Sequence, residues 1–156
     1  VVTPGYKYAL GNVAAAMGVA QLKKFALFKA ARTRLAGMYR AVLSGMDEIT
    51  LPVEREGVEH AWHLFIVRLN LNRLNRTRDE IAHDLRRENI GTGVHFYGLH
   101  LHPYYRETLG IRAEDYPEAT SASEDILSLP LHPQITDKNL HEVVFALKKV
   151  LAHRRK

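Results

Sequence analysis

Apolar side chains recur every three or four residues along a long stretch of this chain, from Val13 to Leu43. Such spacing is that of an amphipathic α-helix, and the Ser44-Gly45 pair predicts where the helix ends. One small domain does not cover a helix of this length, so we expect it to bridge two bodies or to lie in a dimer interface. Its apolar face should then be partly uncovered in the isolated chain. The positions that form this face are Val13, Met17, Ala20, Phe25, Phe28, Ala31, Leu35, Met38 and Val42.

Three later segments have the composition of β-strands. His60 to Asn70 is rich in aromatic and β-branched residues, Thr92 to Phe96 follows Gly91, and Leu127 to Leu131 ends before Pro133. Side chains alternate along a strand, so Trp62 and His63 should face opposite sides, one of them toward the core.

Helix patterns separate these strands. Thr77-Arg78-Asp79-Glu80 is a capping box, which opens a helix with Ile81 and Leu85 facing inward. A short helix is expected over Glu118–Ile126, and Thr136 should cap a last helix. The apolar face of that helix carries Leu140, Val143, Val144, Leu147 and Leu151. The order of elements predicts an α+β fold, with a small, mostly antiparallel sheet covered by helices.

Composition excludes several classes of protein. The chain is 46% hydrophobic and 25% charged, which is typical of a globular domain. No apolar run approaches the roughly 18 residues of a membrane span, and no secretory signal is visible, so we expect a cytoplasmic protein. The absence of cysteine rules out disulfides and thiolate metal sites. Because Val1-Val2-Thr3-Pro4 contains no Met, we expect a piece of a longer chain.

The net charge of +5 does not by itself indicate nucleic-acid binding. Basic residues are scattered, and the only dense group is His153-Arg154-Arg155-Lys156, which is typical of a solvated helix end. Spare positive charge suits an anionic substrate or cofactor equally well. We therefore expect no nucleic-acid partner and no membrane partner.

Glycine-rich sequence gives way to a cluster of His and Tyr at Gly91-Thr92-Gly93-Val94-His95-Phe96-Tyr97, followed by Leu99 to Tyr105. Glycine permits close approaches of the backbone, and such a cluster indicates the polar, aromatic wall of a pocket. His95, His100 and His102 could instead bind a metal. Their irregular spacing and the lack of a nearby carboxylate favour pocket-lining or core-capping roles, so we predict no metal ligand.

A second candidate site precedes the long helix, at Tyr6-Lys7-Tyr8. A lysine beside the amino end of a helix suits an anion such as phosphate, although an exposed lysine is more often only solvated. No nucleophile, base and acid form a recognisable set, and no glycine-rich phosphate loop is present. The sequence therefore predicts no catalytic residue and no self-sufficient catalytic centre.

Several landmarks, in order and at consistent spacing, resemble the DegT/DnrJ/EryC1/StrS family of sugar aminotransferases. They are Pro4–Tyr8 with Gln21-Leu22, His60–Phe65, Ile90–Phe96, His102–Tyr105, and Ser123-Glu124 with Leu127–Leu131. The resemblance implies a pyridoxal phosphate (PLP) fold of the aspartate aminotransferase type. Residues 1–156 would form its small C-terminal domain, with 1–44 a linking segment and long bridging helix, and the cofactor-binding large domain would lie upstream.

The resemblance also implies an activity. Members are homodimers with the site at the subunit boundary, a lysine holds PLP as a Schiff base, and glutamate donates the amino group. The substrate would be a keto nucleotide sugar. Within the family, the likeness is nearest to enzymes that aminate a UDP-4-keto-pentose to give 4-amino-4-deoxy-L-arabinose, the sugar used for lipid A modification and polymyxin resistance.

Residue by residue, His95, Phe96 and Tyr97 match positions lining the sugar-nucleotide pocket. Tyr6 would add to that wall, and Lys7 and Tyr8 would contact the cofactor across the subunit boundary. The Schiff-base lysine and the aspartate that pairs with the PLP ring nitrogen lie upstream of the match. Ala9 stands where the family has Asn or Arg. We therefore expect the isolated chain to be inactive, the alternative being a non-catalytic remnant or a dimerising module that binds sugar nucleotides.

Overall fold

The computed structural model describes residues 3, 5–6 and 8–153, and it confirms an α+β domain. A three-stranded sheet has the order β1-β2-β3, and both pairings are antiparallel. The elements are α1 (Asn12–Leu22), α2 (Phe25–Leu43), β1 (Ile49–Thr50), β2 (Phe65–Leu69), α3 (Arg78–Arg87), α4 (Pro103–Leu109), α5 (Pro117–Asp125), β3 (Ile126–Leu129) and α6 (Asp137–Ala152), with short 3-10 turns at Leu71–Arg73, Leu99–Leu101 and Ala113–Asp115.

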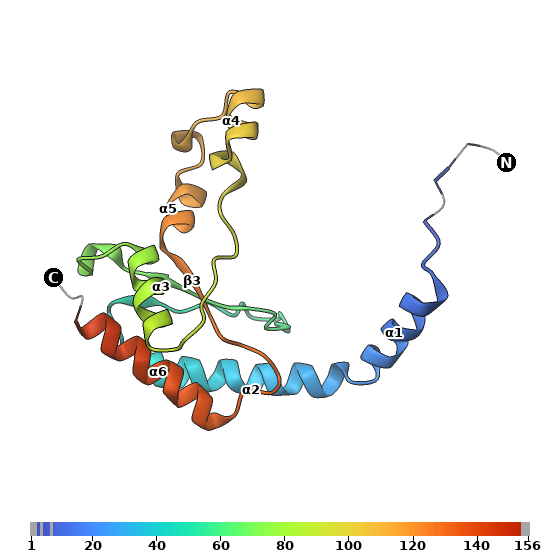
Figure 1. The fold of residues 1–156 in the computed structure, drawn as a ribbon, viewed down its shortest axis with the longest axis horizontal. Coiled ribbons are helices and arrows are strands. Elements are labelled where there is room, and N and C mark those ends of the chain that lie inside the picture. The colour runs from blue at the N-terminus through green and yellow to red at the C-terminus, as the bar shows by residue number, and fades with distance from the viewer. Residues whose placement is uncertain (1–2, 4, 7, 154–156) are drawn as a thin grey trace.

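Strand β2 organises the core. Its buried residues Phe65, Val67 and Leu69 alternate with half-buried ones, so one face of the sheet is apolar. Helices α2 and α6 pack against each other and α3 packs on α6, while α5 contacts β2. Figure 1 shows α2, α3 and α6 gathered in the lower part of the domain, whereas α4 and α5 rise away from it. The chain thus has one compact core and one projecting arm, which carries α4 and α5.

Tyr39 of α2 joins this core to the end of β3. Its ring stacks on Phe65 with centroids 4.9 Å apart, and its hydroxyl donates a 2.9 Å hydrogen bond to the carbonyl of Pro130. The side chain is fully buried, and burial raises the pKa of the Tyr39 phenol because the charged form would lose its hydration. Tyr39 therefore stays a neutral donor inside the core.

Both predicted helix caps are present. The Thr77 hydroxyl accepts from the backbone N–H of Glu80, and the Glu80 carboxylate accepts from the backbone N–H of Thr77. That bond, with further contacts from Arg76 and the Thr77 hydroxyl, lowers the pKa of Glu80 to about 2. Ile81 and Leu85 are buried, as their spacing predicted.

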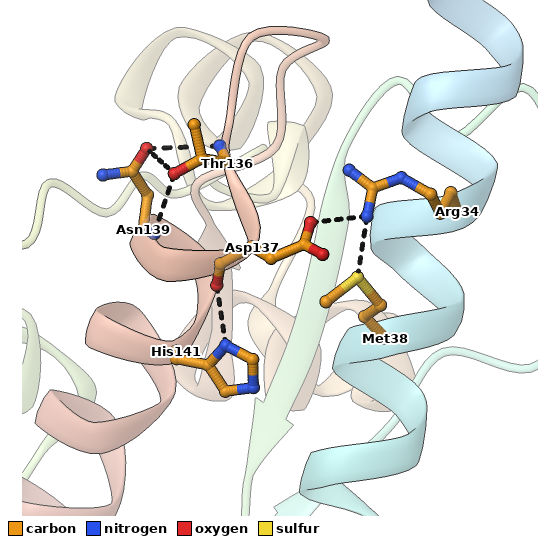
Figure 2. A network of polar contacts seen from close by, with 6 residues as sticks. All are labelled: Arg34, Met38, Thr136, Asp137, Asn139 and His141. Atoms are coloured by element: carbon orange, nitrogen blue, oxygen red, sulfur yellow. Dashed lines mark hydrogen bonds and ion pairs between the residues drawn. The ribbon is translucent and has the colours of Figure 1, made fainter.

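The cap of α6 also ties that helix to α2 (Figure 2). Thr136 and Asn139 form a reciprocal capping box. Asp137, in the first turn of α6, pairs with Arg34 of α2, and the Nδ1–H of His141 donates to the Asp137 carbonyl. The predicted inward residues of α6 are all buried. Local capping and tertiary packing therefore agree in this part of the chain.

The single long helix predicted over Val13–Leu43 is instead divided at Lys23 and Lys24. The N–H of Lys24 bonds to the carbonyl of Gln21 at 2.9 Å, which tightens the turn and interrupts the helical ladder. Both lysines keep backbone angles in the helical region, so the break leaves no mark on the apolar spacing of the sequence. No residue of α1 is buried, so no packing holds it in line with α2. The predicted end at Ser44-Gly45 is correct.

One predicted strand is shorter than expected, and another is absent. The segment from His60 pairs only from Phe65, because Trp62 has a positive φ of 47° and its N–H bonds to the Nδ1 atom of His60 at 2.8 Å. Trp62 is buried and His63 is exposed, so one of the pair faces the core, as predicted, but this arises because the backbone bends there and not because they alternate along a strand. Thr92–Phe96 forms no strand: its pairing is limited to one bridge between Gly93 and Ser128. The third strand is present, shifted to Ile126–Leu129.

The amino-terminal helices present uncovered apolar side chains, as the length of the pattern predicted. Exposed residues include Val13, Met17, Val19, Leu22, Phe25 and Leu27, all more than half exposed. In Figure 1, α1 extends away from the body of the domain. Among the described residues, no helix is both long and apolar enough to cross a membrane.

Glu80→Gln should change the acid sensitivity of the fold. The carboxylate of Glu80 stabilises the folded state fully above its ordinary pKa of 4.5, and this contribution is lost as the pH falls toward 2. The difference in unfolding free energy between wild type and Glu80→Gln should therefore shrink as the pH is lowered. Urea unfolding followed by circular dichroism would measure it, with Glu56→Gln on an exposed loop as the charge control. A difference that is constant with pH would contradict this role.

Tyr39→Phe should cost about 1 kcal/mol of stability, because the Pro130 carbonyl loses its donor while the ring packing remains. The wild type should also lose stability as the pH rises above 10, where the phenol ionises only in the unfolded chain. Tyr39→Phe should lose less over the same range. Tyr104→Phe, at a 69% exposed position, is the control for chemical unfolding at neutral and alkaline pH. If Tyr39→Phe and Tyr104→Phe lost equal stability above pH 10, the buried Tyr39 phenol would not be the source of the alkaline destabilisation.

Candidate functional site

The loop of residues 93–100, called the 93–100 loop below, is fastened to α5 and β3 at several points. Gly93 and Ser128 exchange backbone hydrogen bonds of 3.2 and 2.8 Å. The N–H of Gly98 donates to the hydroxyl of Ser123 at 2.7 Å. At the end of the loop, the Nε2 atom of His100 lies 2.7 Å from the Thr120 hydroxyl. The loop is therefore a fixed part of the domain, although it contains only one β-bridge.

His95 lies half-buried at the base of this loop. Its Nδ1 atom is 2.9 Å from the hydroxyl of Ser128, which is buried in β3. A Cβ atom on Gly93 would come within 2.6 Å of the His95 Cε1 atom. A side chain at position 93 would thus force the imidazole to shift, whereas the backbone angles at Gly93 do not by themselves call for glycine.

Phe96 and Tyr97 project from the loop. Their exposed fractions are 76% and 49%, respectively. The Phe96 ring meets His95 edge to face with centroids 5.1 Å apart, and Tyr97 meets His102 in the same way at 5.2 Å. His95 and Phe96 thus contact each other, whereas Tyr97 contacts His102, and the rings of Phe96 and Tyr97 both face solvent.

His100 has a different environment from His95. It is buried, and its ring lies 5.3 Å from that of Tyr116. The Thr120 hydroxyl donates to the carbonyl of Ala113 at 2.8 Å, so it accepts a hydrogen bond from the Nε2–H of His100. His100 therefore caps the interior of the projecting arm. Within the described ranges, no group of three His, Asp or Glu residues is placed to hold a metal ion.

The other predicted half of the site lies elsewhere. Tyr6 and Tyr8 are each 86% exposed, and their rings contact each other with centroids 5.6 Å apart. Lys7 lies outside the described residues. In Figure 1 the segment before α1 is far from the arm that carries α4 and α5. Within one chain, the described part of the segment before α1 therefore does not reach the 93–100 loop.

A hollow lies beside the end of β2. It has a volume of about 370 Å³ and is lined by polar residues that include Arg68, Asp125 and Ser121. Arg68 binds both carboxylate oxygens of Asp125 at 2.7–3.0 Å and donates to the Ser121 hydroxyl. The hydrogen bonds to Asp125 raise the pKa of Arg68, and the bidentate pairing commits its charge to that carboxylate. The hollow consequently offers no uncommitted guanidinium to an anion.

Sequence reasoning missed the side chains that hold the loop. The short helix predicted over Glu118–Ile126 is present as α5 (Pro117–Asp125), but no partner was predicted for Ser123. Sequence reasoning interpreted Ser128 only as part of an apolar strand. A polar residue inside the run Leu127-Ser128-Leu129 was the available signal, because a buried hydroxyl needs a partner.

Gly93→Ala should displace the His95 ring and break its contact with Ser128, at a cost of about 1–3 kcal/mol for overpacking. Gly91→Ala is the matched control, since a Cβ there meets nothing within 4 Å. A crystal structure of each variant and its urea unfolding curve would measure both effects. An unmoved imidazole in Gly93→Ala would show that the close approach is not what requires glycine.

Comparisons with known proteins agree with this architecture. The sequence profile of the DegT/DnrJ/EryC1/StrS aminotransferase family matches residues 1–148. An uncharacterized protein of Methanocaldococcus jannaschii is 37% identical over 155 residues, which are 99% of this chain and 40% of that protein. The spore coat polysaccharide biosynthesis protein SpsC of Bacillus subtilis is 34% identical over 152 residues, covering 97% of this chain and 39% of SpsC.

Solved structures share the fold. The PLP-form of a putative sugar aminotransferase, Spr1654 from Streptococcus pneumoniae, superposes with a TM-score of 0.88 and 28% identity over 97% of this chain and 38% of that one. The chain thus spans about 40% of the length of the curated relatives it matches. On the extent of the profile match and the shared fold, the chain belongs to the DegT/DnrJ/EryC1/StrS aminotransferase family.

Proposed function

We propose that this chain is the small C-terminal domain of a PLP-dependent aminotransferase that transfers an amino group from glutamate to a keto nucleotide sugar. The observation that carries the proposal is the fixed 93–100 loop, which holds His95 beside the exposed rings of Phe96 and Tyr97. Residues 1–44 would link this domain to the cofactor-binding one. PLP is the cofactor of the family, and it would be bound largely outside this chain.

The chemistry of the loop suits a nucleotide sugar. A half-buried imidazole can donate a hydrogen bond to a sugar hydroxyl or to a phosphate oxygen. Exposed aromatic faces pack against sugar rings and bases, and the Tyr97 hydroxyl adds a polar contact. His95 would fix the orientation of the substrate, and Phe96 and Tyr97 would cover one side of it.

The described residues do not form a complete cofactor site. None of the described lysines is buried, whereas a Schiff-base lysine depends on burial to lower its pKa. Tyr6 and Tyr8 are almost fully exposed rather than enclosed by donors for a phosphate. The chain alone would therefore be inactive, and Tyr6 and Tyr8, with Lys7, would complete a site in a neighbouring subunit. PLP, when bound, supplies the electron sink for amino transfer.

A homodimer is part of the proposal. The uncovered apolar residues of α1 and of the first turn of α2 form a patch of the kind that proteins bury on association. Because the Tyr6–Tyr8 segment and the 93–100 loop lie far apart in one chain, a shared site requires another molecule. Amination of a UDP-4-keto-pentose for lipid A modification is the finer substrate assignment, and it is supported by the sequence landmarks around His95 and His102.

One observation favours a second candidate, a non-catalytic module that dimerises and binds sugar nucleotides. Ala9 is exposed and offers no polar group to a phosphate, next to the exposed Tyr8. Absorbance of the full-length protein with saturating PLP separates the two candidates. A cofactor band supports the enzyme, whereas binding of nucleotide sugar without any cofactor band supports the module.

His95→Gln in the full-length enzyme should raise the KM for the keto nucleotide sugar about ten- to a hundredfold, the loss expected for a hydrogen bond to a charged group. kcat should change much less, because His95 orients the substrate rather than transferring protons. The KM for glutamate should remain unchanged. His141→Gln on α6 is the control in steady-state assays. A fall in kcat with an unchanged KM would contradict a substrate-orienting His95.

A further inference from the structure

Ser128 stands out as a buried polar side chain inside an otherwise apolar strand. It is 4% exposed, and its neighbours Leu127 and Leu129 are both buried in the core. Ser128 pairs with Ile66 of β2, whereas Leu127 and Leu129 pair with Val67 and Phe65. Residues opposite each other in antiparallel strands share a face, so the register turns Ser128 away from the core and toward His95.

The hydrogen-bond partners of Ser128 fix the direction of its contact with His95. Its backbone N–H and carbonyl are both committed to Gly93, so its hydroxyl is what remains for a side-chain contact. Among the described residues, that hydroxyl forms a hydrogen bond only with the His95 Nδ1 atom. If the hydroxyl accepted from Nδ1–H, its own proton would be buried without an acceptor, at a cost of about 1–3 kcal/mol. The hydroxyl therefore donates to Nδ1.

We infer that Ser128 is a positioning residue, which holds the His95 ring with Nδ1 toward its hydroxyl and a proton on Nε2. Because Nδ1 and Nε2 are separated by Cε1 and their bond directions diverge, the Nε2–H then points away from the Ser128 hydroxyl as a donor. This inference rests on the proposed function of the 93–100 loop and deepens it: the loop would offer the nucleotide sugar an N–H donor of fixed direction. It fits an acceptor oxygen, such as that of a sugar hydroxyl, carbonyl or diphosphate.

The role differs from that of the other hydroxyls around the loop. Ser123 accepts from the backbone N–H of Gly98, and Thr120 accepts from buried His100, so both hold the position of the loop. Ser128 alone among these three contacts His95. Removing its hydroxyl leaves the backbone pairing with Gly93 in place, so the ring loses its orientation while the loop keeps its position.

The protonation state of His95 can be read without substrate or cofactor. Proton–nitrogen NMR of the chain, labelled with ¹⁵N in its histidines, distinguishes a protonated from a bare nitrogen in each ring, and His95→Gln assigns the His95 signals among the nine histidines. At neutral to mildly alkaline pH, we expect the His95 proton on Nε2 in the wild type. A wild-type His95 with its proton on Nδ1 would overturn the inference, whatever the variants do.

Ser128→Ala should convert the His95 signals to a mixture of the two neutral forms. Ser128→Thr, which keeps the hydroxyl, should restore the Nε2 form, and Ser123→Ala is the matched control that should leave it intact. Circular dichroism establishes that each variant is folded. If Ser128→Ala does not fold, the position of the His95 proton is compared among wild type, Ser128→Thr and Ser123→Ala. A proton that leaves Nε2 in Ser128→Thr, or that leaves it in Ser123→Ala, would then refute the role of the Ser128 hydroxyl. An unchanged His95 pattern in folded Ser128→Ala would refute the positioning role.

Kinetics of the full-length enzyme give the functional readout. Ser128→Ala should raise the KM for the nucleotide sugar about two- to tenfold, the range of one net hydrogen bond, with little change in kcat. Ser128→Thr should recover the wild-type KM. If the NMR result holds but neither His95→Gln nor Ser128→Ala changes KM, the proposed substrate contact fails while the orientation of the ring stands. If His95→Gln raises KM and Ser128→Ala changes neither signal nor KM, only the positioning role fails.

Discussion

The pairing of β2 with β3 is the constraint on which the rest of the structure depends. Phe65 and Val67 of β2 turn the apolar face of the sheet toward α2 and α6, and Tyr39 locks that face to the end of β3 through Pro130. The same register places Ser128 on the other face, beside the 93–100 loop. A slip of one residue would exchange the two faces, so core packing and the orientation of His95 are set together.

The projecting arm shows how a segment with little regular structure can still be held in place. Few of its backbone groups pair in a sheet, yet hydroxyls from α5 and β3 meet the 93–100 loop at His95, Gly98 and His100. Each contact joins residues at least 20 positions apart in the chain. The consequence is a loop in which the imidazole of His95 is held in place while the side chains of Phe96 and Tyr97 remain exposed.

The amino-terminal part of the molecule has the opposite character. Helix α1 buries none of its residues, and the Tyr6–Tyr8 pair lies far from the loop. The curated relatives are more than twice as long as this chain, and exposed apolar surface of this kind is what proteins bury on association. The amino-terminal segment and the 93–100 loop could therefore contribute to one site only in a larger assembly, such as the proposed dimer.

The sequence by itself determined the features that depend on near neighbours: the Thr77 and Thr136 caps, the inward faces of α3 and α6, the end of α2 at Ser44, and the α+β class. It also identified His95, Phe96 and Tyr97 as one cluster, because they are adjacent in the chain. Only the tertiary structure decided the break at Lys23-Lys24, the turn at Trp62 and the contact between Ser128 and His95. The reason is that periodicity reports which side chains share a face. Where an element stops, and which distant hydroxyl meets an imidazole, depend instead on packing and register between segments far apart in the chain.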